Sequence, residues 1–225
     1  MKAVVFDLFE TLITEWGHEK YTTRRMCADL GLPYEAARPF WEAMHERQYR
    51  GTLSFGDSLR ELSAALGMDV DEARIAHVTE MRRRTKAACF DALHPEILPM
   101  LDALRAQGMR LAILSNCSGE EVACIRKSVL APYFDAIILS HEMGVCKPEA
   151  AIYMLAADAL GVGCDDCIFV GDGGSRELYG AEAVGMRAYR AMWYLCKMPM
   201  PIKAIPEFRC IELPGELPDI IKSEA

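Results

Sequence analysis

Apolar residues along this chain follow two different patterns, and the change from one pattern to the other predicts where its elements lie. Residues 3–6 form an unbroken apolar run behind a single lysine, which is typical of a strand buried on both faces. Between residues 19 and 88 the apolar positions recur every three or four residues instead, as on one face of a helix. From residue 92 onward short apolar runs alternate with helical stretches. The pattern therefore predicts an α/β protein with a helical insert after its first strand.

The alternating part of the chain predicts most of a parallel sheet and the helices that cover it. We expect further strands at residues 109–114, 136–139, 167–170, 187–189 and 210–213. We expect helices at residues 95–107, 119–130, 149–160 and 175–184. Repeated strand–helix–strand units connect through right-handed crossovers, so these strands are expected to lie parallel in one sheet with helices on both faces.

The insert is predicted to contain four helices, at residues 19–30, 35–50, 55–66 and 70–88. We expect residues 1–14 and 91–225 to form the α/β core and residues 15–90 to form a helical cap domain. Because the insert follows the first strand directly, the cap is expected to lie over the end of that strand, where it can close a site.

Composition and charge narrow the functional classes. The 225 residues are 52% hydrophobic, enough for one well-packed core with a modest insert, and the net charge of −8 argues against binding to nucleic acid or anionic membranes. No stretch approaches the roughly 20 apolar residues of a membrane span, and we expect no signal peptide, because the first strand begins almost at once. The nine cysteines are scattered, as expected for reduced thiols. We therefore expect a cytoplasmic enzyme of small metabolites.

A basic cluster lies near the end of the fourth expected cap helix. It consists of Arg82, Arg83, Arg84 and Lys86. A run of like charges on a helix is usually a solvated face, and we expect that here. Contact between the cap and an anionic substrate is the alternative interpretation.

Four polar stretches, each at or near the end of an expected strand, point to one site. Asp7 follows the first strand, Ser115 and Asn116 follow the second, Lys147 precedes a helix, and Asp172 ends another strand. Ligands of open parallel sheets bind beyond the carboxyl ends of the strands. A carboxylate nucleophile, small donors for phosphate oxygens, a fixed cation and a metal-binding carboxylate are what phosphoryl transfer to an aspartate requires. The sequence offers each of them.

In this order and spacing the four stretches resemble the haloacid dehalogenase-like (HAD) hydrolase superfamily, in particular its members with a helical cap inserted after the first motif. The resemblance implies that Asp7 is the nucleophile and that Ser115 binds the phosphate or oxyanion. It further implies that Lys147 orients the nucleophile and balances its charge.

The same resemblance implies a magnesium site and two substrate-binding positions. Mg²⁺ would be held by Asp7, by Asp172 and by the backbone carbonyl of Phe9. Glu177, five residues after Asp172, would add a further carboxylate. The matched substrate-binding positions are Thr11 and Asn116.

Two positions depart from the phosphatase pattern. Phosphatases of the superfamily usually carry a second aspartate two residues after the nucleophile as acid and base, and here that residue is Phe9, which cannot transfer a proton. An aromatic residue there resembles the 2-haloacid dehalogenases, which need no such acid and no metal. Tyr153 also falls where those enzymes carry a tyrosine, but many capped members have an aromatic residue there, and we expect a core tyrosine. Glu10 could replace the missing acid, or be a turn residue.

The sequence therefore predicts a Rossmann-like parallel α/β core with an inserted four-helix cap. The leading predicted function is Mg²⁺-dependent hydrolysis of a small phosphorylated metabolite through an aspartyl-phosphate at Asp7. One alternative is a metal-independent 2-haloacid dehalogenase acting through an aspartyl ester at the same residue. Another is a low-turnover member that binds a phosphorylated ligand or a protein partner. The expected partner is a small anionic molecule, and the oligomeric state is left open.

Overall fold

A single six-stranded parallel sheet forms the centre of the protein in the computed structural model, which describes residues 1–16, 19–198 and 201–223. The spatial order of the strands is β3-β2-β1-β4-β5-β6, and every pair is parallel. The strands are β1 (Ala3–Phe6), β2 (Arg110–Ser115), β3 (Ala136–Leu139), β4 (Cys167–Gly171), β5 (Arg187–Ala191) and β6 (Arg209–Ile211). The predicted Rossmann-like parallel sheet is confirmed.

The first strand occupies the middle of the sheet, which explains its continuous apolar sequence. All four residues of β1 are buried, because β2 and β4 flank it and helices cover both faces. Phe6 lies opposite Ile113 on one side and Val170 on the other. This register brings the carboxyl ends of the three strands to one edge of the sheet, where the residues that follow them meet.

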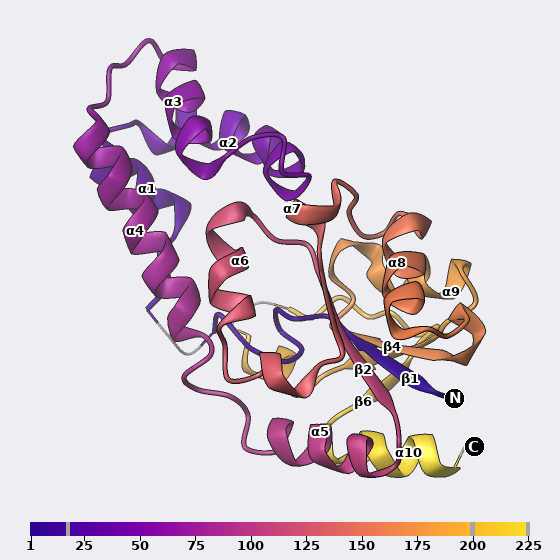
Figure 1. Ribbon diagram of the computed structural model, residues 1–225. Helices are drawn as coiled ribbons and strands as arrows, with labels where there is room; N and C mark the ends of the chain where they lie inside the picture. Colours follow the sequence, from indigo (N-terminus) through magenta and orange to yellow (C-terminus); the bar gives the residue numbers. More distant parts are fainter. Residues whose placement is uncertain (17–18, 199–200, 224–225) are drawn as a thin grey trace.

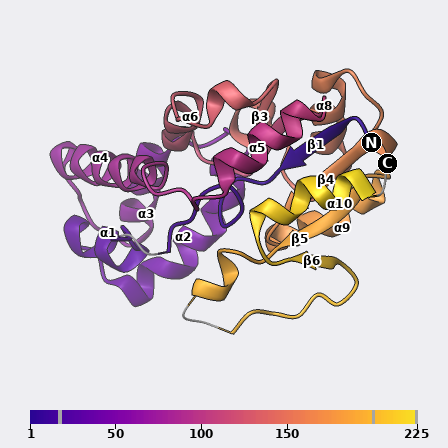
Figure 2. The same ribbon diagram turned by 90° about the horizontal axis from the view of Figure 1, so that it is seen from below.

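Helices cover the sheet on both faces and bury two separate apolar layers. The core helices are α5 (Ile97–Ala106), α6 (Gly119–Arg126), α7 (Ser140–Met143), α8 (Ala150–Leu160), α9 (Glu177–Ala183) and α10 (Leu217–Ser223). One layer packs α5, α6 and α10 on the sheet, and the other packs α8 and α9 on its opposite face. Figure 2 shows α5 and α10 lying across the sheet side by side.

Four helices form a second unit beside the core, as the sequence predicts, and we call them the cap. They are α1 (Thr23–Leu30), α2 (Tyr34–Tyr49), α3 (Phe55–Ala65) and α4 (Glu72–Ala88). The cap has its own apolar cluster, which includes Trp41, Leu59 and Leu62. The cap projects from the end of the sheet at which β1 ends and the chain continues toward α1. Helix α4 runs back toward α6 of the core (Figure 1). The exact limits of the cap domain stay a prediction.

Three elements differ from the sequence-based expectation. The structure adds α7 and the C-terminal α10, whose buried residues include Leu217 and Ile221. The helix expected at residues 175–184 begins instead with a 3-10 turn, Gly174–Arg176, and α9 follows it. Ser175 in that turn has a φ of 51°, a conformation outside the α-helical region.

All nine cysteines are free thiols. Within the described ranges, no helix combines the length and apolar character that crossing a bilayer would require.

Candidate active site

Three of the predicted site residues form a buried ionic cluster at the carboxyl end of the sheet. Asp7 directly follows β1, Lys147 lies three residues before α8, and Glu177 begins α9. The Lys147 ammonium contacts Asp7 Oδ1 and lies 2.5 Å from Glu177 Oε2. No more than 5% of any of the three residues is exposed. The sheet and its two crossovers thus bring together groups that are 140 residues apart in the chain.

Burial and mutual charge shift the proton affinities within this cluster. Burial raises the pKa of Asp7, with Asp172 adding to the effect and Lys147 opposing it. The pKa of Glu177 is raised well above its ordinary value, first by burial and then by the charge of Asp7. Burial alone would lower the pKa of Lys147, but the two carboxylates outweigh it and raise that pKa. The lysine therefore remains charged beside the nucleophile candidate.

Asp172 completes an acidic group next to this cluster. It follows β4, and its Oδ1 accepts a hydrogen bond of 2.9 Å from the Gly174 N–H. Its backbone carbonyl accepts a hydrogen bond of 2.9 Å from Arg190 Nε, which fixes the loop. Ligand atoms of Asp7, Asp172 and Glu177 lie within 4.8 Å of one another. Carboxylate oxygens in such a group are the ligand type that Mg²⁺ prefers.

Both the carboxylate and the backbone carbonyl of Glu177 are held by hydrogen bonds. Its Oε1 accepts a hydrogen bond of 3.1 Å from the Gly173 N–H, while Oε2 faces Lys147. Its backbone carbonyl accepts a hydrogen bond of 2.9 Å from the fully buried Tyr153 hydroxyl. Tyr153 is therefore a core residue that supports the start of α9.

The end of β2 contributes a clamp on the lysine. The Asn116 side chain donates to the Lys147 carbonyl at 3.0 Å and accepts from the Lys147 N–H at 2.8 Å. Asn116 also lines the cavity described below. Ser115 is fully buried, and its hydroxyl lies 3.4 Å from the Asn116 carbonyl. Asn116 thus holds the backbone of Lys147, a role that the sequence argument missed.

The loop after β1 carries Phe9, Glu10 and Thr11. Glu10 has a φ of 60°, and its carboxylate accepts hydrogen bonds from the Thr14 hydroxyl and from the Glu15 N–H, the latter at 2.9 Å. Burial raises the pKa of Glu10 in spite of these donors. Thr11 is fully buried, and its hydroxyl has no hydrogen-bond partner among the described residues.

A cavity of about 240 Å³ lies between these core residues and the cap. Its residues come from the strand ends, from the loop after β1, from α2 and α4 of the cap, and from α6. The side chains lining it are Asp7, Phe9, Glu10, Glu15, Tyr49, Lys86, Asn116, Glu121, Lys147, Asp172, Ser175 and Glu177. Most of the predicted site residues therefore border one space, whereas Ser115 and Thr11 are not among those found to line it.

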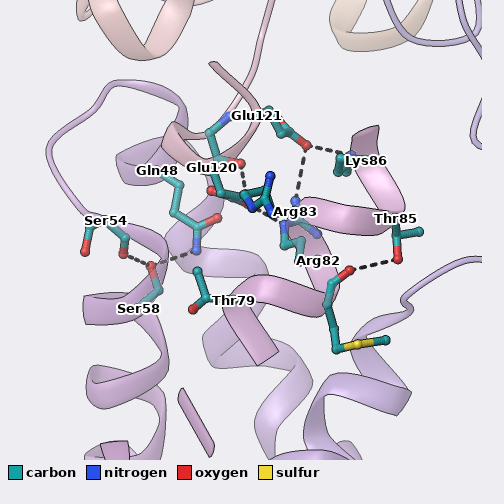
Figure 3. A network of polar contacts seen from close by, with 12 residues as sticks. Gln48, Ser54, Ser58, Thr79, Arg82, Arg83, Thr85, Lys86, Glu120 and Glu121 are labelled. Atoms are coloured by element: carbon teal, nitrogen blue, oxygen red, sulfur yellow. Dashed lines mark hydrogen bonds and ion pairs between the residues drawn. The ribbon is translucent and has the colours of Figure 1, made fainter. Parts of the chain in front are cut away.

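The cap side of the cavity holds an ionic network that the sequence argument missed. Lys86 Nζ lies 2.6 Å from Glu121 Oε1, and Arg82 contacts Glu120 and Glu121 (Figure 3). Although burial favours its neutral form, the two cations hold the pKa of Glu121 below its ordinary value. The expectation of a wholly solvated basic cluster is thus wrong for Arg82 and Lys86. The signal in the sequence was the acidic pair Glu120 and Glu121, but only the tertiary fold brings this pair to the basic cluster.

Comparison with known proteins identifies the family. The sequence model of the haloacid dehalogenase-like hydrolase family matches residues 1–185 of this chain. The chain belongs to this family. It is therefore a hydrolase, and the resemblance inferred from its four motifs is confirmed.

Relatives of both expected kinds match the chain over its length. The glyceraldehyde 3-phosphate phosphatase of Methanopyrus kandleri is 27% identical, and the alignment covers 100% of this chain and 99% of that protein. The structure of a 2-haloacid dehalogenase from Pseudomonas syringae is 23% identical, with a TM-score of 0.76 and full coverage of both chains. A HAD family enzyme from Bacteroides thetaiotaomicron, solved with magnesium and inorganic phosphate, is 18% identical, with a TM-score of 0.61 over 85% of this chain and 94% of that one.

Proposed function

We propose that this hydrolase is a Mg²⁺-dependent phosphatase of a small phosphorylated metabolite and acts through an aspartyl-phosphate at Asp7. The observation that carries the proposal is Asp172, whose ligand atom lies within 4.8 Å of those of Asp7 and Glu177. When ionised, the three carboxylates bring three negative charges, and Lys147 balances one of them. Asp7 and Glu177 are buried and Asp172 is half-buried, so an excess of two negative charges here is costly unless a cation compensates it, and a divalent cation does so.

The available oxygens fit magnesium at this place. Asp172 accepts its hydrogen bond at Oδ1, and both oxygens of Glu177 are already engaged by Gly173 and Lys147. Asp7 and Asp172 are therefore the side chains that would hold the ion. The backbone carbonyl of Phe9 is the further ligand that we propose, and Glu177 would contribute its charge nearby. The bound ion would supply positive charge for the phosphate oxygens.

The chain's own residues provide the remaining parts of the reaction. The carboxylate oxygen of Asp7 that Lys147 does not contact attacks phosphorus, while Lys147 holds the other oxygen and fixes the angle of attack. Asn116 holds the backbone of Lys147 in place. Water then cleaves the aspartyl-phosphate and restores Asp7. The phosphatase of Methanopyrus kandleri, similar over its whole length, supports this reaction class.

Phosphate release tests the proposal. A panel of phosphorylated metabolites is incubated with the native chain and with Asp7→Asn, each in Mg²⁺ and in EDTA. We expect release that requires Mg²⁺ and that falls by at least about 10³-fold in Asp7→Asn, because an amide is a poor nucleophile. Release that persists undiminished in EDTA or in Asp7→Asn would contradict the proposal.

A second candidate function is favoured by Phe9 alone. Its side chain lines the cavity with Asp7 and cannot transfer a proton, which suits a leaving halide. A 2-haloacid dehalogenase reaction would form an ester at Asp7 without metal, and the dehalogenase of Pseudomonas syringae shares the fold. Halide release from 2-chloropropionate in EDTA, with no phosphate release from the panel, would establish this function in place of the first.

A further inference from the structure

The reaction cavity has two chemically different ends. At the core end lie Asp7, Lys147 and Asp172, and at the cap end lie Tyr49 and Lys86. In a phosphoryl transfer the attacking and leaving oxygens are in line on opposite sides of phosphorus. With Asp7 as the nucleophile at the core end, the leaving oxygen must point toward the cap end. Negative charge therefore develops there as the bond to phosphorus breaks.

Lys86 is the cation that the cap places at this end. Among the described residues that line the cavity, Lys147 and Lys86 are the two with a positive side chain, and Lys147 is already engaged with Asp7. The Lys86 ammonium lies 4.2 Å from the centroid of the Phe9 ring and 2.7 Å from Glu15 Oε1. Phe9, two residues after the nucleophile, thus presents its aromatic face to a buried ammonium.

The two carboxylates that pair with Lys86 do not occupy all of its hydrogen-bond donors. An ammonium has three N–H donors, and its salt bridges to Glu15 and Glu121 use at most two of them. The third is available to an oxygen in the cavity. Since only 12% of the side chain is exposed, water competes weakly for that donor, and a contact with developing charge is worth more than it would be in bulk solvent.

The other groups that could serve the leaving oxygen are less suited. Glu10 accepts hydrogen bonds at both oxygens, which leaves no proton on offer while it is ionised. Tyr49 lines the same cavity but is neutral, and a neutral donor stabilises an anion less than a cation does. Glu15 and Glu121 are the salt-bridge partners of Lys86. Charge and position together single out Lys86.

We propose that Lys86 is a further catalytic residue, which donates a hydrogen bond to the leaving oxygen of the phosphate ester and stabilises its negative charge in place of a proton-donating acid. The inference rests on the phosphatase function proposed above. The phosphorus–oxygen bond breaks as the bond to Asp7 forms, and the leaving oxygen keeps the electron pair. That oxygen then takes a proton from water, and the hydroxide produced cleaves the aspartyl-phosphate, which restores Asp7 and releases phosphate.

Substrates with different leaving groups test this role. The leaving group of p-nitrophenyl phosphate is a stable anion that needs little help, whereas that of glycerol 2-phosphate is a basic alkoxide. With Mg²⁺ present, we expect Lys86→Met to lower kcat/KM for glycerol 2-phosphate by about 10²-fold or more. For p-nitrophenyl phosphate we expect a change of less than about fivefold. Retained turnover of the nitrophenyl ester also shows that the variant is folded.

Two further variants complete the experiment. Lys86→Arg keeps the charge, and we expect it to recover much of the loss on glycerol 2-phosphate. Arg83→Met, on the exposed face of the same helix and paired with Glu80, should leave both substrates unaffected. Equal losses on the two esters in Lys86→Met, or none on either, would overturn the inference while leaving the phosphatase function intact. No release from either ester by the native chain would overturn the proposed function and this inference with it.

Discussion

At the scale of single residues, the site depends on side chains that hold other side chains in place. Asn116 is the clearest case, because both of its hydrogen bonds go to the backbone of Lys147, 31 residues away. Lys147 in turn contacts Asp7 and Glu177. A small shift of the lysine backbone would therefore move the ammonium relative to the nucleophile.

Asn116→Ala should impair turnover more than substrate binding. With both hydrogen bonds lost, the Lys147 backbone is free to shift, and misplacement by about 1 Å can cost on the order of 10²-fold in rate. We expect kcat to fall by about 10- to 100-fold with little change in KM. Steady-state kinetics on the native chain and the variant, with the best substrate of the phosphate panel, measure both constants.

A matched control separates positioning from stability. Asp135→Ala also removes a bond between side chain and backbone, the 2.8 Å contact from the Leu111 N–H, but far along the sheet from Asp7. It should lower the free energy of unfolding without changing kcat. If Asn116→Ala raised KM and left kcat intact, Asn116 would instead be a simple substrate contact.

The sequence predicts the core half of the site better than the cap half, for a physical reason. Asp7, Asp172 and Asn116 directly follow strands, and parallel strands end at one edge, so the pattern alone brings them together. Lys86 and Glu121 meet because α4 packs on α6, a contact between helices that no local period encodes. Their pairing required the fold.

At the scale of elements, the strongly periodic segments were predicted well and the short, weakly patterned ones were not. The four cap helices and the buried strands appear within a few residues of their expected limits. The strands have continuous apolar runs and α1 and α3 have a distinct apolar face, whereas the long α4 buries only Ile75 and Val78. The C-terminal α10 spans only Leu217–Ser223 and includes a proline, so its pattern is too short to be distinctive. Packing on α5 stabilises it instead.

The loop after β1 is also fixed by a distant element, the segment after β5. Trp193 Nε1 donates to the Thr11 carbonyl at 2.7 Å, and the indole is buried. Trp193→Phe would leave that carbonyl buried without its donor and remove part of the ring. We expect a loss of about 2–4 kcal/mol in the free energy of unfolding. Urea denaturation of the native chain and the variant measures it.

Trp41→Phe provides the comparison for this prediction. Trp41 is buried in the cap and packs against Phe55, but its indole N–H has no hydrogen-bond partner among the described residues. This change removes volume without leaving a carbonyl unpaired, so it should cost less. Equal destabilisation by the two substitutions would mean that the bond to Thr11 contributes little.

At the scale of the whole molecule, ionic contacts that differ in burial join the cap to the core. On one side Arg82 bonds to Glu120 and Glu121, where the carboxylate side chains are 4% and 3% exposed (Figure 3). On the other side Arg50 pairs with Glu149 at 2.7 Å, in a much more exposed position. One contact thus joins α4 to α6, and the other joins the residue after α2 to the residue before α8.

Arg82→Met should destabilise the protein strongly at any salt concentration. Removing the guanidinium leaves Glu120 buried without its cation and Glu121 with Lys86 alone, and breaking a buried ion pair in this way costs about 3–5 kcal/mol. Arg50→Met removes an exposed pair, so its effect should be small at low salt and disappear in about 1 M NaCl, where charges are screened within about 3 Å. Urea denaturation of the native chain and both variants at both salt concentrations measures the four differences in the free energy of unfolding. If Arg82→Met lost its effect in high salt, the contact between α4 and α6 would have to be hydrated in solution, and the cap would stand more open over Asp7 than the structure has it. If the effect persists, buried charge rather than surface attraction holds the cap closed, and Lys86 is kept at the cavity by the same network.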